Sequence, residues 1–470
     1  FIICLTFFLT LISASQAQKK FTINGYLTEK STGESLVGAN VYLKKNPAVG
    51  TVSNNYGFYS ITLNEGFYDL VISYTGYNNI DLALELRSDT TIQIKLSEGV
   101  LMDEIVITSD ELKKNLESNE MGTIDLSVES IKRLPALLGE IDALKALQLL
   151  PGVSSATEGT AGLYVRGGGP DQNLVLLDEA VVYNTGHLLG FFSVFNSDAI
   201  RNTRLIKGSM PAEYGSRISS VIDVQMKEGN DEYYSIDGGV GLISSRITAQ
   251  GPVRKHKSSF ILSARRTYAL DLAQPFINQT NFAGTNYYFY DLNTKINFRL
   301  SKKDRLYLSG YFGRDVFKFK SGERAFSVEL PYGNATSTLR WNHILKENLF
   351  ANFSMIYNDY NFQLNGGQEE FQVRLNSGVR DFSIKSDLDY YPSPSHHIKT
   401  GLRHTYHQLT PNIVSATNGE VEFKSNLTKK FAHESELYLS DDWKLNSGLS
   451  VNYGLRLSAF VFLGPYKSSL

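Results

Sequence analysis

Four of the eight histidines in this 470-residue chain lie close together and are its first candidates for holding a metal ion. They are His396, His397, His404 and His407. On a strand, His404 and His407 point to opposite faces, and no carboxylate and histidine pattern of metal-ligand spacing accompanies them. We therefore expect solvated residues of a sheet here, with no metal and no other cofactor.

Three consecutive glycines, Gly167, Gly168 and Gly169, form a second candidate, a phosphate-binding loop. Such a loop opens onto a helix whose N-terminal amides meet the anion. Here Pro170 and a strand-like run follow, and no Gly-Lys-Ser/Thr comes after them. The pattern instead predicts a tight connection between two strands.

A third candidate is the segment Asp103, Glu104, Ile105, Val106, Ile107 and Thr108, in which two acidic residues precede a β-branched run. An extended segment of this kind can add as a strand to the edge of a partner's sheet. The residues alone leave two alternatives open, namely the last strand of the preceding domain and the first strand of the next.

Composition limits the class of protein. A net charge of −2 gives no strong case for nucleic-acid binding, and aromatic residues, at 12% of the chain, suit β-structure or an aromatic girdle at a membrane interface. Residues 1–17 are uncharged and end in Ser15-Gln16-Ala17, which predicts a secretory signal peptide. The missing initiator Met predicts an incomplete N-terminus. If the only cysteine, Cys4, leaves with the signal, stability must come from packing and strand pairing.

Three domains are expected after the signal peptide. Residues 18–98 alternate apolar and polar positions between Gly/Asn turns, which predicts a small antiparallel sandwich. Residues 99–120 read as the strand-like segment and a linker. Residues 121–230 predict a compact mixed domain, with a helix from Gly139 to Leu150 and strands at 173–177 and 200–207.

Residues 231–470 have long alternating strands. Lys295, Asn297 and Arg299 fall on one face, with apolar residues on the other. Long strands of this kind predict an outer-membrane barrel, whereas a soluble sandwich has strands nearer five or six residues.

The expected barrel is too narrow to be complete. About ten strands close to a diameter of roughly 20 Å. The domain at 121–230 would be about 34 Å across. A barrel of about 22 strands, about 44 Å wide, accommodates it, so about half of the barrel is expected to be missing.

The order of these parts resembles a TonB-dependent outer-membrane receptor of the Bacteroidetes type. The first domain resembles a carboxypeptidase regulatory-like domain through Gly25, the step at 38–41 and the turns at 55–59 and 74–77. The most specific matches lie in 163–173, 175–178, 206–215 and 220–224. The implied fold is mainly β, with an N-terminal transthyretin-like β-sandwich, an α+β plug domain and an incomplete transmembrane antiparallel β-barrel. Within the plug, the matching motif residues are Arg166, Gly167, Gly168, Gly169, Asp178, Lys207, Gly208, Tyr214, Gly215 and Arg217.

The resemblance also implies a function without enzymatic chemistry. Such receptors import a nutrient (a glycan, a peptide or a metal chelate) across the outer membrane, with the N-terminal domain in the periplasm. Asp103 to Thr108 would be the TonB box, pulled by the TonB, ExbB and ExbD complex, and a surface lipoprotein lid would be a further partner. The alternative is a signalling or adhesive receptor that binds without transport.

Two residues in this plug carry a further expectation. Arg166 and Arg217 lie in β-rich surroundings and are expected to form ion pairs between plug and barrel. The family commonly has Asp-Gly where this chain has Asp178-Glu179, so this turn is expected to differ.

Overall fold

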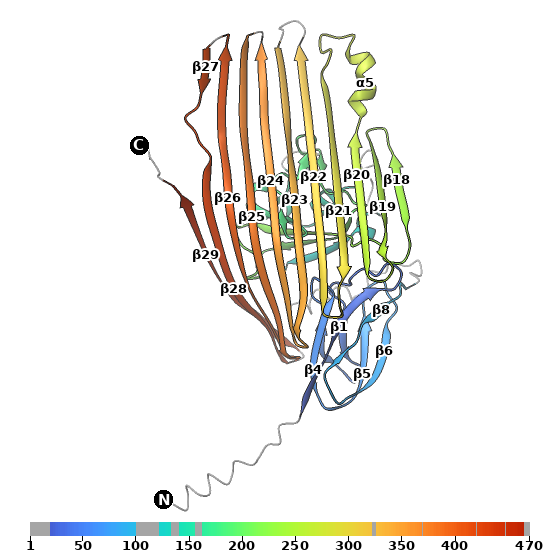
Figure 1. Ribbon diagram of the computed structural model, residues 1–470. Coiled ribbons are helices and arrows are strands. Elements are labelled where there is room, and N and C mark those ends of the chain that lie inside the picture. The colour runs from blue at the N-terminus through green and yellow to red at the C-terminus, as the bar shows by residue number, and fades with distance from the viewer. Residues whose placement is uncertain are drawn as a thin grey trace, which may run out of the picture.

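The computed structural model describes residues 19–99, 122–132, 141–155, 162–321, 326–368, 370–419, 421–446 and 448–464. Three bodies follow one another along the chain (Figure 1). A small sandwich, blue in Figure 1, lies at the lower end of a tall sheet, and the plug lies behind this sheet. The mainly β architecture that the sequence predicts is confirmed.

The sandwich consists of two four-stranded sheets. In the first, β1 pairs with β4, β7 and β8, and in the second the strand order is β3-β2-β5-β6. Its strands are β1 (Lys20–Glu29), β2 (Asn40–Leu43), β3 (Asn46–Val52), β4 (Phe58–Asn64), β5 (Gly66–Ser73), β6 (Ile80–Leu86), β7 (Thr90–Thr91) and β8 (Ile94–Leu96).

The sandwich departs from the antiparallel prediction at one place. Its last two strands, β7 and β8, both pair with β1 in parallel. The alternating apolar positions do face a common core, with Ile23, Leu70 and Ile72 at 0% exposure. This core consists of sandwich residues alone, while Tyr26 and Phe58 belong to a second cluster that includes Phe350 of the barrel sheet.

The plug is built on a five-stranded sheet of order β13-β12-β17-β16-β9. Strands β12 and β17 are parallel, and the other pairs are antiparallel. Its elements are β9 (Thr123–Ser127), α3 (Val128–Lys132), α4 (Ala143–Gln148), β10 (Val153–Ser154), β11 (Tyr164–Val165), η1 (Pro170–Gln172), β12 (Asn173–Leu177), β13 (Ala180–Val181), β14 (Gly186–His187), η2 (Leu188–Gly190), β15 (Phe192–Ser193), β16 (Ile200–Lys207) and β17 (Ser220–Met226).

The predicted helix is present as α4, shorter than expected. Asp142 caps it by accepting from the backbone N–H groups of Leu144 and Lys145, at 2.9 and 3.2 Å. Leu144 and Leu147, one helical turn apart, are both fully buried in the plug core. The apolar face of this helix is therefore a packing face.

The last body is an antiparallel sheet of twelve strands in which most neighbours along the chain pair, and β27 pairs only with β26. The sequence had indicated about ten; β18 and β27 have only 6 and 4 residues. The elements are β18 (Ser235–Val240), β19 (Ser244–Arg254), β20 (Ser258–Thr267), α5 (Ala269–Ile277), β21 (Asn286–Arg299), β22 (Asp304–Ser321), β23 (Phe326–Lys346), β24 (Leu349–Gln368), β25 (Phe371–Ser393), β26 (His396–Asn418), β27 (Val421–Lys424), β28 (Lys430–Asn446) and β29 (Leu449–Leu463).

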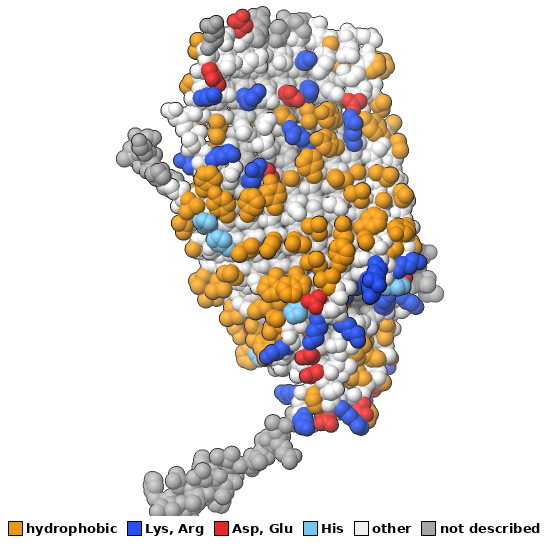
Figure 2. Space-filling model, viewed as in Figure 1, with side chains coloured by type: hydrophobic (Ala, Val, Ile, Leu, Met, Phe, Trp, Pro, Cys, Tyr) orange, Lys and Arg blue, Asp and Glu red, His pale blue; other side chains and the backbone are white. Residues whose placement is uncertain are grey.

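This barrel sheet has its polar face inward. On β21, Lys295 and Asn297 are buried against the plug while Phe298 faces outward, as the alternation predicts. Figure 2 shows apolar side chains in a broad band over the outer face, with charged side chains mostly above and below it. An apolar exterior around a polar interior is the arrangement of a barrel in lipid. Among the helices of the described ranges, none is both long and apolar enough to cross a membrane.

Candidate functional site

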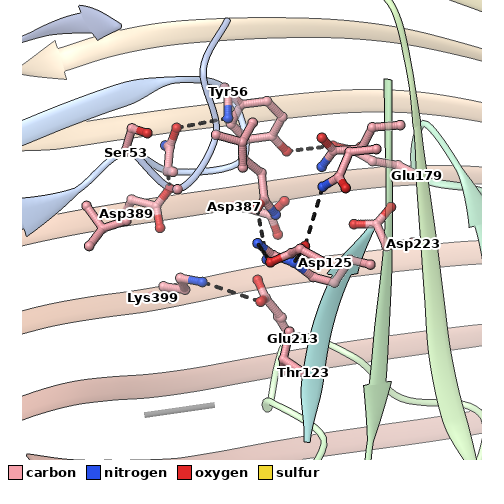
Figure 3. A pocket seen from close by; sticks show the side chains of 18 of the residues that line it. Ser53, Tyr56, Thr123, Asp125, Glu179, Glu213, Asp223, Asp387, Asp389 and Lys399 are labelled. Carbon is pink, nitrogen blue, oxygen red and sulfur yellow. Dashed lines mark hydrogen bonds and ion pairs between the residues drawn. The ribbon is translucent and has the colours of Figure 1, made fainter. Parts of the chain in front are cut away.

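A cavity of about 1880 Å³ lies where the sandwich, the plug and the barrel sheet meet. Figure 3 shows Tyr56 of the sandwich, Glu179 and Asp223 of the plug, and Asp387 and Asp389 of the sheet on its wall. These residues come from segments far apart in the sequence. The cavity is therefore a product of the docking of the three bodies.

The plug reaches this cavity with the tight hairpin between β12 and β13, in which Leu177 pairs with Ala180. Both turn residues have positive φ, 46° for Asp178 and 75° for Glu179. A two-residue turn of this kind favours Asn or Asp followed by Gly. Glu179 thus occupies a position that costs a residue with a Cβ about 1 kcal/mol, and contacts made by its side chain must offset this.

The Glu179 carboxylate touches the other two bodies. Its Oε1 accepts from the Tyr56 hydroxyl at 2.6 Å and from Asn352 Nδ2 at 3.1 Å, and it lies 3.6 Å from Arg340 Nη1. Burial raises the pKa of Glu179, but the cations Lys385 and Arg340 outweigh burial and hold it at about 2. Glu179 is therefore an anion at neutral pH.

Asp178 points the other way, into the interface with β21. Its Oδ2 lies 2.9 Å from Lys295 Nζ, and both side chains are 3% exposed. Its Oδ1 accepts from the backbone N–H of Met226 at 3.1 Å. Burial raises the pKa of Asp178, but the cations Lys295 and Arg340 outweigh burial, so the pKa lies below its usual value. A buried ion pair thus joins plug and sheet.

His187 is a second buried link, and the sequence offered no signal for it. Its Nδ1 lies 2.7 Å from Asp315 and its Nε2 lies 3.2 Å from Asp291, both on barrel strands. Burial lowers the pKa of His187, but hydrogen bonds to Asp291 and Asp315 outweigh burial and raise it above its usual value. An imidazolium held between two carboxylates fixes this part of the plug to β21 and β22.

Asp223 of β17 faces the same cavity and is 8% exposed. Burial raises the pKa of Asp223 to about 6, although the Arg204 cation acts to lower it. The Tyr214 hydroxyl donates to its Oδ2 at 3.4 Å. Asp223 is therefore a carboxylate whose ionisation is costly.

The glycine run forms a tight connection. Gly167 lies in the turn after β11 with φ 85°, and Gly169 precedes η1, which has only three residues. A Cβ on Gly168 would come 2.4 Å from Ser219 Oγ, so glycine is required by this close approach. A long helix does not follow, and the phosphate-loop alternative gains no support.

The ion pairs between plug and barrel expected for Arg166 and Arg217 are not found among the described residues, and for barrel strands outside them the expectation stays a prediction. Arg166 is exposed beside Gly208, and Arg217 donates to the carbonyl of Ser216, its neighbour. Neither forms an ion pair with a described residue. Among the described residues, acidic side chains on the hairpin and loops of the plug form ion pairs with barrel cations: Asp178 with Lys295, Asp198 with Arg246, and Glu213 with Lys399.

Two other residues of the plug motif, Lys207 and Gly215, make close contacts within the fold. Lys207 Nζ donates to the carbonyl of Pro151 at 2.5 Å. A Cβ on Gly215 would come 2.2 Å from Arg456 Nε, so barrel strand β29 packs directly on this loop. Arg456 also donates to the carbonyl of Ala212 at 2.9 Å.

The histidines behave differently from the solvated residues expected. His407 lies 2.7 Å from Asp381 and 3.1 Å from Glu434, and its side chain is 12% exposed. His404 is on the opposite face of β26, with Nε2 3.2 Å from His433 Nδ1. His396 and His397 lie 2.8 and 3.1 Å from carboxylates, those of Asp441 and Asp389. Carboxylate partners thus hold three of the four.

One other group has metal-ligand character. Asp231, Glu232 and His256 place ligand atoms within 4.8 Å of one another. Arg299 lies 2.6 Å from Asp231, and Lys95 lies 3.6 Å from Glu232. The protein's own cations therefore already balance these carboxylates.

Two predicted segments, the signal peptide at 1–17 and the candidate TonB box from Asp103 to Thr108, lie outside the described residues.

Two family models match the chain. The CarboxypepD_reg-like domain matches residues 23–107, and the TonB-dependent Receptor Plug Domain matches residues 123–220. The first match extends into the candidate TonB box. The segment can therefore be either the last strand of the sandwich domain or a strand that adds to a partner's sheet.

Individual proteins match over smaller shares. Bacillopeptidase F of Bacillus subtilis is 33% identical over 18% of this chain and 6% of its own length. TonB-dependent receptor P39 of Formosa agariphila is 26% identical over 48% of this chain and 22% of its own. The outer membrane transporter YddB of Escherichia coli has a similar fold, with a TM-score of 0.55, 12% identity and coverage of 72% and 56%.

The matched part of this chain thus spans less than two thirds of each of these proteins. The plug match, the curated receptor and the fold agree on one type of protein. The chain carries a carboxypeptidase regulatory-like domain and a TonB-dependent receptor plug against a barrel sheet, and in this order of parts it is similar to TonB-dependent receptors.

Proposed function

We propose that this protein is a TonB-dependent receptor that imports a nutrient across the outer membrane with energy supplied by the TonB, ExbB and ExbD complex. One observation carries the proposal: a plug is held by buried ion pairs against the polar face of a sheet whose other face is apolar. Moving such a plug breaks its buried ion pairs, and breaking a buried pair costs about 3–5 kcal/mol, so the movement needs an energy source. The plug match and the transporter YddB support the same function.

The proposal assigns the sandwich to the periplasm and the outer face of the sheet to outer-membrane lipid. The sandwich lies at the end of the sheet opposite its longest connection, the segment with α5 between β20 and β21 (Figure 1). In such barrels the short turns are periplasmic and the longer loops extracellular. The nutrient is a glycan, a peptide or a metal chelate, and a surface lipoprotein lid is a further proposed partner.

Deletion of Asp103 to Thr108 tests the function. We expect uptake to be lost and surface binding to be retained, because the force would no longer reach the plug. Deletion of six residues in the following tract, Lys113 to Ser118, is the control of equal length. Normal uptake without Asp103 to Thr108 would contradict the proposed mechanism.

The nutrient is identified by growth of a deletion strain on glycans, peptides, iron chelates and cobalamin. Loss of growth on one class, restored by the intact gene, would name it. A receptor that only signals or adheres predicts unchanged growth on all of them together with loss of ligand binding at the cell surface.

A further inference from the structure

The sandwich is docked on the barrel sheet through an aromatic contact. Phe58 stacks on Phe350 with ring centroids 5.1 Å apart, and Tyr56 stacks on the same ring at 5.5 Å. Phe58 and Phe350 are both at 0% exposure. Rings buried to this degree between two domains belong to a packed interface, because separation would expose both to water.

Polar contacts fix the position of the docked sandwich. Asn54 Nδ2 donates to Asp389 Oδ2 at 3.0 Å, and Ser60 Oγ donates to the carbonyl of Glu347 at 3.0 Å. The Arg305 guanidinium lies 3.4 Å from the centre of the Tyr26 ring. The contacts come from three barrel strands or turns, so they define one orientation.

The sandwich also forms hydrogen bonds with the plug at two places. Tyr56 donates to Glu179 in the β12–β13 hairpin at 2.6 Å. At the other end, Glu34 Oε1 accepts from the backbone N–H of Glu228, which follows β17, at 2.9 Å. Arg201 on β16 donates to the carbonyl of Ser35 at 2.9 Å. The sandwich therefore contacts the plug at the β12–β13 hairpin and, at the other end, at β16 and the residues that follow β17.

These contacts couple movement of the plug to undocking of the sandwich. If the plug shifted while the sandwich stayed docked, Glu179 would lose its Tyr56 partner in a buried site, and a buried charge without its partners is unfavourable. The positive φ of Glu179 adds to this cost, because the contacts of its side chain offset the backbone strain of the turn.

We propose that the carboxypeptidase regulatory-like domain is a lock on the plug, which must leave the barrel mouth before the plug can move. The lock rests on the proposed transport function. It gives the domain a role that needs no ligand and no chemistry of its own.

A reducible cross-link across the interface tests the lock. Asn54→Cys combined with Asp389→Cys places thiols at two positions whose native side chains touch at 3.0 Å, within reach of a short bifunctional methanethiosulfonate that joins them through reducible disulfides. Cys4 is the only other cysteine in the 470 residues. In the full-length receptor, with the cross-link verified by mass spectrometry, we expect uptake to fall at least tenfold and surface binding to persist. Reduction should restore uptake to the level of the two single-cysteine variants.

Cross-linked receptor that imports at the rate of the single variants would overturn the lock. Absence of uptake in the unsubstituted receptor, with ligand still bound, would instead refute the transport function itself.

A second measurement does not depend on a disulfide forming. Tyr56→Phe keeps the stacked ring but removes the hydroxyl held by Glu179, and we expect at least tenfold faster hydrogen exchange in both the 54–58 turn and the β12–β13 hairpin. Tyr68→Phe is the matched control, because that hydroxyl donates to Asn64 inside the sandwich. Unchanged exchange of the hairpin in Tyr56→Phe would show that the sandwich does not hold the plug.

Discussion

The buried pair between Asp178 and Lys295 leads to the most quantitative prediction. Asp178→Asn removes the charge but keeps the shape, the acceptor for the Met226 N–H and a residue type that tolerates the φ of 46°. Lys295 would then be a buried ammonium at 3% exposure without its anion. Removing one partner of a buried pair costs about 3–5 kcal/mol.

Hydrogen exchange measured on the detergent-solubilised receptor reads out this cost. A local loss of about 3–5 kcal/mol speeds exchange of the β12 and β17 amides by roughly two to nearly four orders of magnitude. Adding Lys295→Met should recover much of the loss, because an apolar side chain of similar volume replaces the unpaired charge. Glu213→Gln, at the more exposed Glu213–Lys399 pair, should cost about 1 kcal/mol or less.

Two results would refute this reasoning. One is a loss below about 1 kcal/mol in Asp178→Asn, which would place the pair in the range of surface salt bridges. The other is simple additivity in the double variant, which would mean that the two side chains do not interact.

Two further predictions concern Asp223 and the outer face. Because the pKa of Asp223 is raised from 3.8 to about 6, the folded plug binds more protons than the unfolded plug in this window, so stability falls by about 3 kcal/mol as pH rises through it. Between pH 4.5 and 7.5 this linkage amounts to about 2 kcal/mol. Thermal unfolding at these two pH values should lose that difference in Asp223→Asn but keep it in Asp171→Asn, at an exposed site. On β25, Ile384 is 56% exposed on the apolar face; Ile384→Arg should cost up to about 2–4 kcal/mol of insertion into liposomes. Heat-modifiable gel mobility measures the folded fraction, and equal yields for Ile384→Arg and Ile384→Ala would argue against a lipid-facing position.

Local patterns in the sequence were enough for individual elements. The runs at 173–177 and 200–207 are β12 and β16 with the predicted bounds, because apolar runs between glycine turns specify a strand without outside help. The polar and apolar faces of β21 follow from strand alternation in the same way. The fold class, the order of domains and the tight glycine connection were therefore readable directly.

Only the tertiary structure decided which residues meet at the site. Tyr56 and Glu179 are 123 positions apart, and His187 and Asp315 are 128 apart; no local pattern marks such pairs. Arg166 and Arg217 looked suitable by type, yet the plug is held by Asp178, His187 and Glu213, because its docking brings these against barrel cations and carboxylates. Periodicity assigns residues to faces within one element, but a contact between elements depends on how whole surfaces pack.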